Sequence, residues 1–128
     1  MRDWSVIRER YLRDELPIRL GGLAANLARI KSFSSNMANC DVVEGLLEES
    51  KFFIEWTVAD AEVNTAAELV EIQIQLARWQ HAWASIWADF AQRMKVAEQS
   101  RVWSDRVLDM SGLLHENYMP DSRMSNSR

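Results

Sequence analysis

The sequence predicts an all-α protein, and three observations support that fold class. Hydrophobic residues make up 48% of the 128 residues and charged residues 27%, as in ordinary globular domains. Glycine and proline are absent from residues 46–111, whereas an all-β domain needs a turn about every 8–12 residues. Apolar side chains recur there at alternating spacings of three and four, which favours helices. We therefore expect an antiparallel bundle of three to four long helices.

The first predicted helix spans residues 4–33 and is bent or broken around residues 15–18. Asp3 precedes it and is a suitable N-cap. The apolar positions change register near Pro17, where the proline ring and its missing N–H interrupt helical hydrogen bonding. We expect the kink of this first helix to lie near Pro17.

The second predicted helix begins at Asp41 after a polar loop. Glu44 follows three residues later and completes a capping-box pattern. The helix ends somewhere in residues 57–65, where the suitable caps are Thr57, Asp60, Asn64 and Thr65, and Thr65 with Glu68 repeats the capping-box pattern.

The third predicted helix has the clearest pattern, a heptad seam that loses its register near Gln99. Either a fourth helix begins there or the third continues with a stutter, and Gly112 is the expected stop. A continuous helix from residue 65 to 114 would be about 75 Å long. Because the second helix covers only part of that length, we expect the chain to fold back near Gln99, with dimerisation in addition. The expected buried positions are Leu69, Ile72, Leu76, Trp79, Trp83, Ile86 and Phe90.

The domain organisation is predicted to be simple. Residues 1–114 are expected to form one helical domain, and residues 115–128, with Pro120 and few apolar residues, a flexible C-terminal tail. The single Cys40 cannot form an internal disulfide. Since the sequence also lacks an apolar run typical of a membrane span or secretory signal, we expect a cytoplasmic protein with no membrane insertion.

The net charge of −4 is unevenly distributed along the chain. Residues 41–77 contain nine acidic side chains and one lysine. The arginines of the first helix, Arg19 among them, alternate with acidic residues, so we expect a solvated face that packs partly on the second helix. The negative net charge and the alternation of basic with acidic side chains argue against a nucleic-acid partner. The functional alternative is an acidic surface that selects a basic partner.

Motifs for catalysis and cofactor binding are scarce, so we predict no cofactor and no catalytic residue. Neither His81 nor His115 has a glutamate three residues before it, as di-metal carboxylate bundles require. Carboxylates of the second and third helices could instead hold Mg²⁺ in a metal-dependent hydrolase, although helix capping and solubility explain them equally well. The carboxylates of that alternative are Glu44, Glu48, Glu68 and Glu71.

Two patterns suggest interaction surfaces. Trp79, Trp83 and Trp87 recur every four residues, as expected for a core, an interface or a pocket for a planar apolar ligand. Gly21 and Gly22 lie inside a predicted helix, where each costs about 1 kcal/mol relative to alanine. Close approach of the tryptophan-bearing helix would offset that cost, with Asn26 beside the glycines as a hydrogen-bonding anchor.

The leading functional hypothesis is a non-enzymatic interaction or assembly module that self-associates as a homodimer or binds another protein. A binder of a planar ligand or pigment in the bundle core and the metal-dependent hydrolase are the alternatives. The predicted binding residues are Trp79, Trp83, Trp87, Gly21, Gly22 and Asn26.

Overall fold

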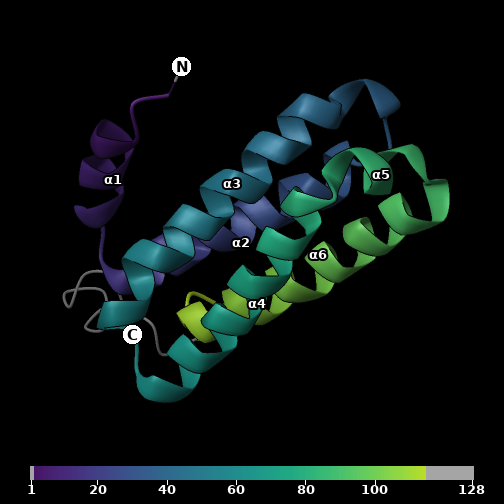
Figure 1. The fold of residues 1–128 in the computed structure, drawn as a ribbon. Coiled ribbons are helices and arrows are strands. Elements are labelled where there is room, and N and C mark those ends of the chain that lie inside the picture. The colour runs from purple at the N-terminus through teal and green to yellow at the C-terminus, as the bar shows by residue number, and fades with distance from the viewer. Residues whose placement is uncertain (1, 115–128) are drawn as a thin grey trace.

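Every regular element in the computed structural model, which describes residues 2–114, is a helix, as the sequence predicts (Figure 1). None of the helices in this range is both long and apolar enough to cross a membrane. The α-helices are α1 (Trp4–Leu12), α2 (Leu16–Phe33), α3 (Cys40–Thr57), α4 (Val63–His81), α5 (Trp83–Ala88) and α6 (Phe90–Ser111), and the 3₁₀ helices are η1 (Met37–Asn39) and η2 (Val58–Asp60).

Four long helices, α2, α3, α4 and α6, surround one hydrophobic core, and the short α1 crosses their direction beside α3 (Figure 1). Helix α2 packs against α6 and α3, and α3 packs against α4. Helix α1 contacts α3 through its aromatic side chains: the ring centroids of Trp4 and Phe52 are 4.4 Å apart, and those of Tyr11 and Phe53 are 4.1 Å apart. The most completely buried large side chains come from all four helices, so the core runs along the whole length of the molecule. They are Leu23, Leu27, Ile30, Val43, Leu47, Ile54, Leu69, Leu76, Val96 and Val107.

The N-terminal segment forms two separate helices where the sequence predicts one kinked helix. Helix α1 begins after Asp3, whose carboxylate accepts hydrogen bonds from two backbone N–H groups, as predicted. It ends at Leu12, and α2 starts at Leu16 after an extended Glu15. Pro17 lies in the first turn of α2, where a missing N–H leaves no helical hydrogen bond unmade. Proline therefore starts a helix here.

The predicted caps of the next two long helices are wrong in detail. Helix α3 starts at Cys40 because η1 leads directly into it, so the backbone is already helical at Asp41. Helix α4 is capped by Glu62, whose carboxylate accepts a hydrogen bond from the Thr65 N–H at 2.9 Å.

The chain folds back at residues 82–90, and the predicted reversal near Gln99 is therefore wrong. Helix α4 ends at His81, the six-residue α5 follows, and α6 begins after Asp89. The Asp89 carboxylate caps α6 by accepting hydrogen bonds from the Ala91 and Gln92 N–H groups. Because the two buried tryptophans of α5 keep the spacing of the heptad seam, the apolar pattern conceals the break. Phe90, predicted to be buried, is 67% exposed.

Helix α6 returns along α2 and covers its small-residue face. The Ser104 hydroxyl donates a hydrogen bond to the Ala24 carbonyl at 2.8 Å. A Cβ atom on Gly21 would lie 2.8 Å from Leu113 Cδ1, whereas one on Gly22 would lie 3.9 Å from a Tyr11 ring carbon. Gly21 thus makes room for Leu113, whereas Gly22 has space for a Cβ atom beside Tyr11. The expectation that the two glycines receive the tryptophan row is wrong.

Gly112 ends α6 with a left-handed backbone, φ 75°, as predicted for a helix stop. The tail predicted over residues 115–128, including His115, lies outside the described residues.

The two adjacent glycines of α2 should respond differently to alanine. We expect Gly22→Ala to raise the free energy of unfolding by about 0.5–1 kcal/mol, because alanine favours a helix interior and its Cβ meets only ordinary contacts. Gly21→Ala should be clearly less stabilising, since Leu113 must move. Urea denaturation of the two variants measures this difference. Equal stabilisation by both would contradict the close approach of Leu113 to α2.

Candidate functional site

The three predicted tryptophans do not form one row. Trp83 and Trp87 lie on α5, each 4% exposed, with ring centroids 5.3 Å apart. Their indole N–H groups donate to the carbonyls of Cys40 at 3.2 Å and Met37 at 3.0 Å. Both side chains therefore fasten α5 to the start of α3, and neither offers a free ring face to a planar ligand.

Trp79 belongs to a different place in the molecule. It lies on α4, is partly buried, and packs against Trp103 of α6 with ring centroids 5.1 Å apart. The break after His81 separates it from the two tryptophans of α5.

Asn26 is buried and its hydrogen-bonding groups are used within the molecule. Its amide donates to the Glu49 carboxylate on α3 at 2.9 Å, and its amide oxygen accepts from the Arg29 guanidinium at 2.9 Å. It anchors α2 to α3.

The carboxylates of the metal hypothesis are not gathered into a ligand set. Glu68 accepts two hydrogen bonds from the Arg106 guanidinium, at 2.6 and 2.9 Å. In the part of the chain that the structure describes, no group of three or more His, Cys, Asp or Glu side chains is placed to hold a metal ion, Glu44, Glu48 and Glu71 included.

Partial burial, followed by the charges of Asp41 and Glu44, raises the pKa of the Cys40 thiol and disfavours its thiolate.

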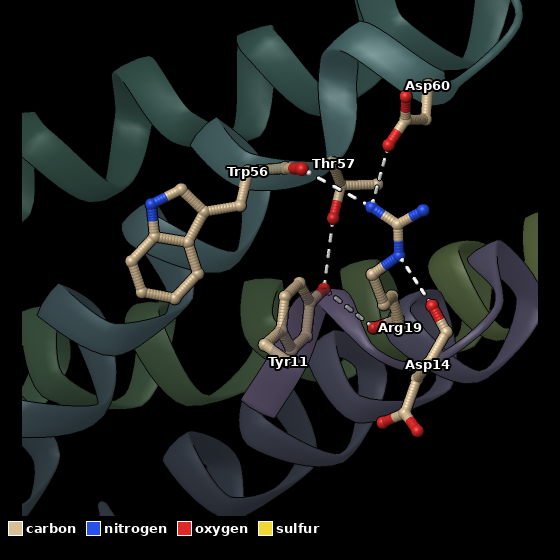
Figure 2. A network of polar contacts seen from close by, with 6 residues as sticks. All are labelled: Tyr11, Asp14, Arg19, Trp56, Thr57 and Asp60. Atoms are coloured by element: carbon tan, nitrogen blue, oxygen red, sulfur yellow. Dashed lines mark hydrogen bonds and ion pairs between the residues drawn. The ribbon is translucent and has the colours of Figure 1, made fainter. Parts of the chain in front are cut away.

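A buried polar network joins the start of α2 to the end of α3 (Figure 2). The Arg19 side chain, only 8% exposed, donates hydrogen bonds to the carbonyls of Asp14 at 3.1 Å and Trp56 at 3.3 Å, and it pairs with Asp60 at 3.0 Å. Arg19 therefore lies in the packing of α2 on the end of α3, which the sequence also predicts, and not on a solvated face. Its charge lies at the carboxyl end of α3, where the helix dipole favours a cation.

Tyr11 brings α1 into the same network. Its hydroxyl donates to the Arg19 carbonyl at 2.9 Å. Since a tyrosine has one hydroxyl proton, the Thr57 hydroxyl, 3.0 Å away, donates to Tyr11. Burial raises the pKa of Tyr11 to about 12. A phenol held neutral in this way is a poor general base, and its two hydrogen bonds give it a structural role.

Arg93 plays the corresponding role at the opposite end of the molecule. It is 6% exposed and donates to the carbonyls of Ser34 at 3.2 Å and Trp87 at 2.8 Å. Its guanidinium also lies over the rings of Trp87 and Phe90 at 5.3 and 5.5 Å. Because these carbonyls are near the carboxyl ends of α2 and α5, two helix dipoles stabilise the charge without a carboxylate.

Among residues 2–114, the outer face of α4 carries a row of exposed apolar side chains. Five apolar residues follow one another there at spacings of four and three, and all five are exposed. The exposed fractions of Val63, Val70 and Ile74 are 81%, 38% and 48%. A surface helix ordinarily carries polar residues on this side. We call this surface the α4 seam; it consists of Val63, Ala67, Val70, Ile74 and Ala77.

Shallow hollows flank the α4 seam on both sides, and Ile74 borders both. One lies between α4 and α6, has a volume of about 520 Å³, and is lined in part by Trp103. The other lies between α3 and α4, has a volume of about 350 Å³, and contains Phe52. The flank toward α6 carries the exposed Glu71 and Arg78, seven residues apart, and the hollow there is also lined by the ion pair of Glu68 and Arg106. A helix laid on the seam would therefore find an apolar ridge with a groove on each side.

Sequence reasoning missed the α4 seam although its signal was present. The helix carries two apolar stripes, and the buried one, which includes Leu69, Ile72 and Leu76, was read as its only seam. The second stripe has the same three-four spacing.

Comparisons with protein-family models, with curated proteins and with solved structures found no match to this chain.

Replacing Arg93 by lysine should destabilise the fold. Lysine keeps the charge but lacks the planar fork that reaches two carbonyls at once, so we expect the free energy of unfolding to fall by about 1.5–3 kcal/mol. The matched control is Arg106→Lys, at an exposed residue paired with Glu68, which should change stability little. Urea denaturation tests both variants. If Arg93→Lys loses no more stability than Arg106→Lys, the bridging role of Arg93 is wrong.

Tyr11 should make stability sensitive to strongly alkaline pH. Its pKa rises from 10.0 to about 12 on folding, so folding favours the neutral phenol. The contribution of the neutral Tyr11 phenol to the free energy of unfolding, about 2–3 kcal/mol, is complete below pH 10 and is lost as the pH rises through about 12. Tyr11→Phe should be less stable than the wild type at pH 9 and should lack this alkaline loss. Urea denaturation at pH 9 and 11.5 should show that the difference in free energy of unfolding between the wild type and Tyr11→Phe is smaller at pH 11.5. An equal difference at both pH values would contradict the burial of a neutral phenol.

Proposed function

We propose that this protein is a non-enzymatic helical assembly module that self-associates through the α4 seam. The observation that carries the proposal is the exposed heptad-spaced apolar stripe on α4, since heptad spacing is the pattern by which one helix buries its apolar residues against another. Exposed apolar patches of this kind mark interaction sites on soluble domains.

The other polar clusters support a structural protein better than an enzyme. Arg19, Tyr11 and Arg93 use their donors on backbone carbonyls, and Asn26 is satisfied between two helices. We propose that the long helices form an antiparallel bundle that works as a rigid frame for α4. Short connections between α2 and α3 and between α3 and α4 support that arrangement. We also propose a cytoplasmic homodimer, in keeping with the lone Cys40 and the acidic composition.

The two hollows beside the seam support a helix as the occupant. Phe52 lines one hollow and Trp103 the other, and Ile74 lines both. A second α4 on the seam would bring its own side chains over both. Aromatic residues in such recesses are frequent energetic centres of protein interfaces.

A charged residue at the centre of the α4 seam should abolish self-association. We expect the wild type to be dimeric at about 50–100 µM and Ile74→Glu to be monomeric there, with association weakened at least about a hundredfold because a glutamate is buried without a partner. Light scattering coupled to size-exclusion chromatography measures the mass, and circular dichroism checks that the variant is folded.

Val42→Glu is the matched control. Val42 is a 49% exposed valine on α3, away from the seam, and its replacement should leave the dimer intact. The proposal fails if the wild type is monomeric at these concentrations, or if Ile74→Glu and Val42→Glu associate equally well.

A further inference from the structure

The charges beside the α4 seam are arranged so that two copies of the helix complement each other in one direction. Glu71 and Arg78 lie on the same flank, seven residues and therefore two turns apart, and both are exposed. Within the described residues, neither side chain takes part in an ion pair. The acidic residue is nearer the start of α4 and the basic one nearer its end.

In an antiparallel second copy, the order of Glu71 and Arg78 along the interface is reversed. With the two-fold axis between residues 75 and 76, Glu71 of each copy lies about 3 Å along the helix axis from Arg78 of the other. The two long side chains can reach each other over that offset, and the contact is made twice. The apolar layers then place Ile74 against Ala77 of the second copy and Val70 against His81, so large side chains meet smaller or flat ones. Val63 and Ala67 lie beyond the overlap of the two α4 helices, because α4 ends at His81. Such self-complementarity is what a two-fold interface requires.

The other arrangements lack this match. In a parallel pair, the flanking positions would place Glu71 opposite Ala66 and Arg78 opposite Gln73 of the second copy, without an opposite charge. An antiparallel pair shifted by one heptad would place Glu71 against Glu71 at the two-fold axis, where like charges repel. Charge complementarity therefore separates one arrangement from its competitors.

We infer that the partner of the α4 seam is a second copy of this chain, lying antiparallel across α4, with Glu71 of each copy paired to Arg78 of the other. The inference rests on the proposed function and adds the direction and register of the pair. The contact is partly solvated, so it sets orientation and specificity more than total affinity.

Charge reversal tests the register. Glu71→Arg and Arg78→Glu should each weaken the dimer, raising the dissociation constant about tenfold or more at low salt, because each places like charges together twice. The double variant Glu71→Arg/Arg78→Glu should restore the wild-type value. Glu9→Arg, an exposed reversal on α1, is the matched control and should have little effect. Sedimentation equilibrium gives the dissociation constants. A Glu71→Arg dimer tighter than the wild type, or a double variant without restoration, overturns the inference.

Disulfide cross-linking tests the direction, in a Cys40→Ser background. In the antiparallel register, the two copies of residue 67 are about 25 Å apart along the helices, far beyond the roughly 7 Å between Cα atoms that a disulfide spans. Ala67→Cys should therefore stay uncross-linked under oxidation, whereas a mixture of Val70→Cys and His81→Cys chains should form the mixed disulfide. Efficient cross-linking of Ala67→Cys would show a parallel pair and overturn the inference while leaving self-association standing. A wild type that is monomeric by mass overturns both.

Discussion

The insertion of Arg93 between the ends of α2 and α5 is the interaction on which the path of the chain depends. Its guanidinium bonds the carbonyls of Ser34 and Trp87, which belong to segments far apart in the sequence. Those bonds hold the short α5 against the end of α2 and set the direction in which α6 departs. Because α6 then runs back along α2, it supplies the fourth side of the core. Without this attachment, α4, α5 and α6 could form one long helix with an uncovered apolar side.

Arg19 solves the same physical problem at the other end of the molecule. Both arginines are buried, and both donate to backbone carbonyls at helix carboxyl ends. A buried cation without compensation is very costly; here the partial negative charge of the helix ends supplies much of the compensation. The same bonds satisfy terminal carbonyls that a helix leaves without partners. Each arginine thus stabilises itself and the helix ends that it joins.

The sequence predicted those features that depend on neighbouring residues and missed those that depend on distant ones. The Asp3 cap and the Gly112 stop are confirmed because each is decided within a few residues. The reversal at residues 82–90 was missed because Asp89 resembles any surface carboxylate and the contacts of Arg93 exist only in the folded chain. For the candidate site, the spacing of the α4 seam was present in the sequence, but spacing alone does not show which of two apolar stripes the core covers.

The position of the reversal also explains why the α4 seam lacks an internal partner. If the chain reversed near Gln99, the helix before the reversal would be longer, and the other helices would have more of its surface to cover. With the turn at α5, helix α6 packs on α2, α3 packs between α2 and α4, and α4 buries its inner stripe against α3. No further helix among residues 2–114 lies on the opposite side of α4. The exposed apolar residues Val63, Ala67, Val70, Ile74 and Ala77 are therefore not needed to close the core of one copy. The contacts that close the bundle are thus the same contacts that leave the outer face of α4 exposed.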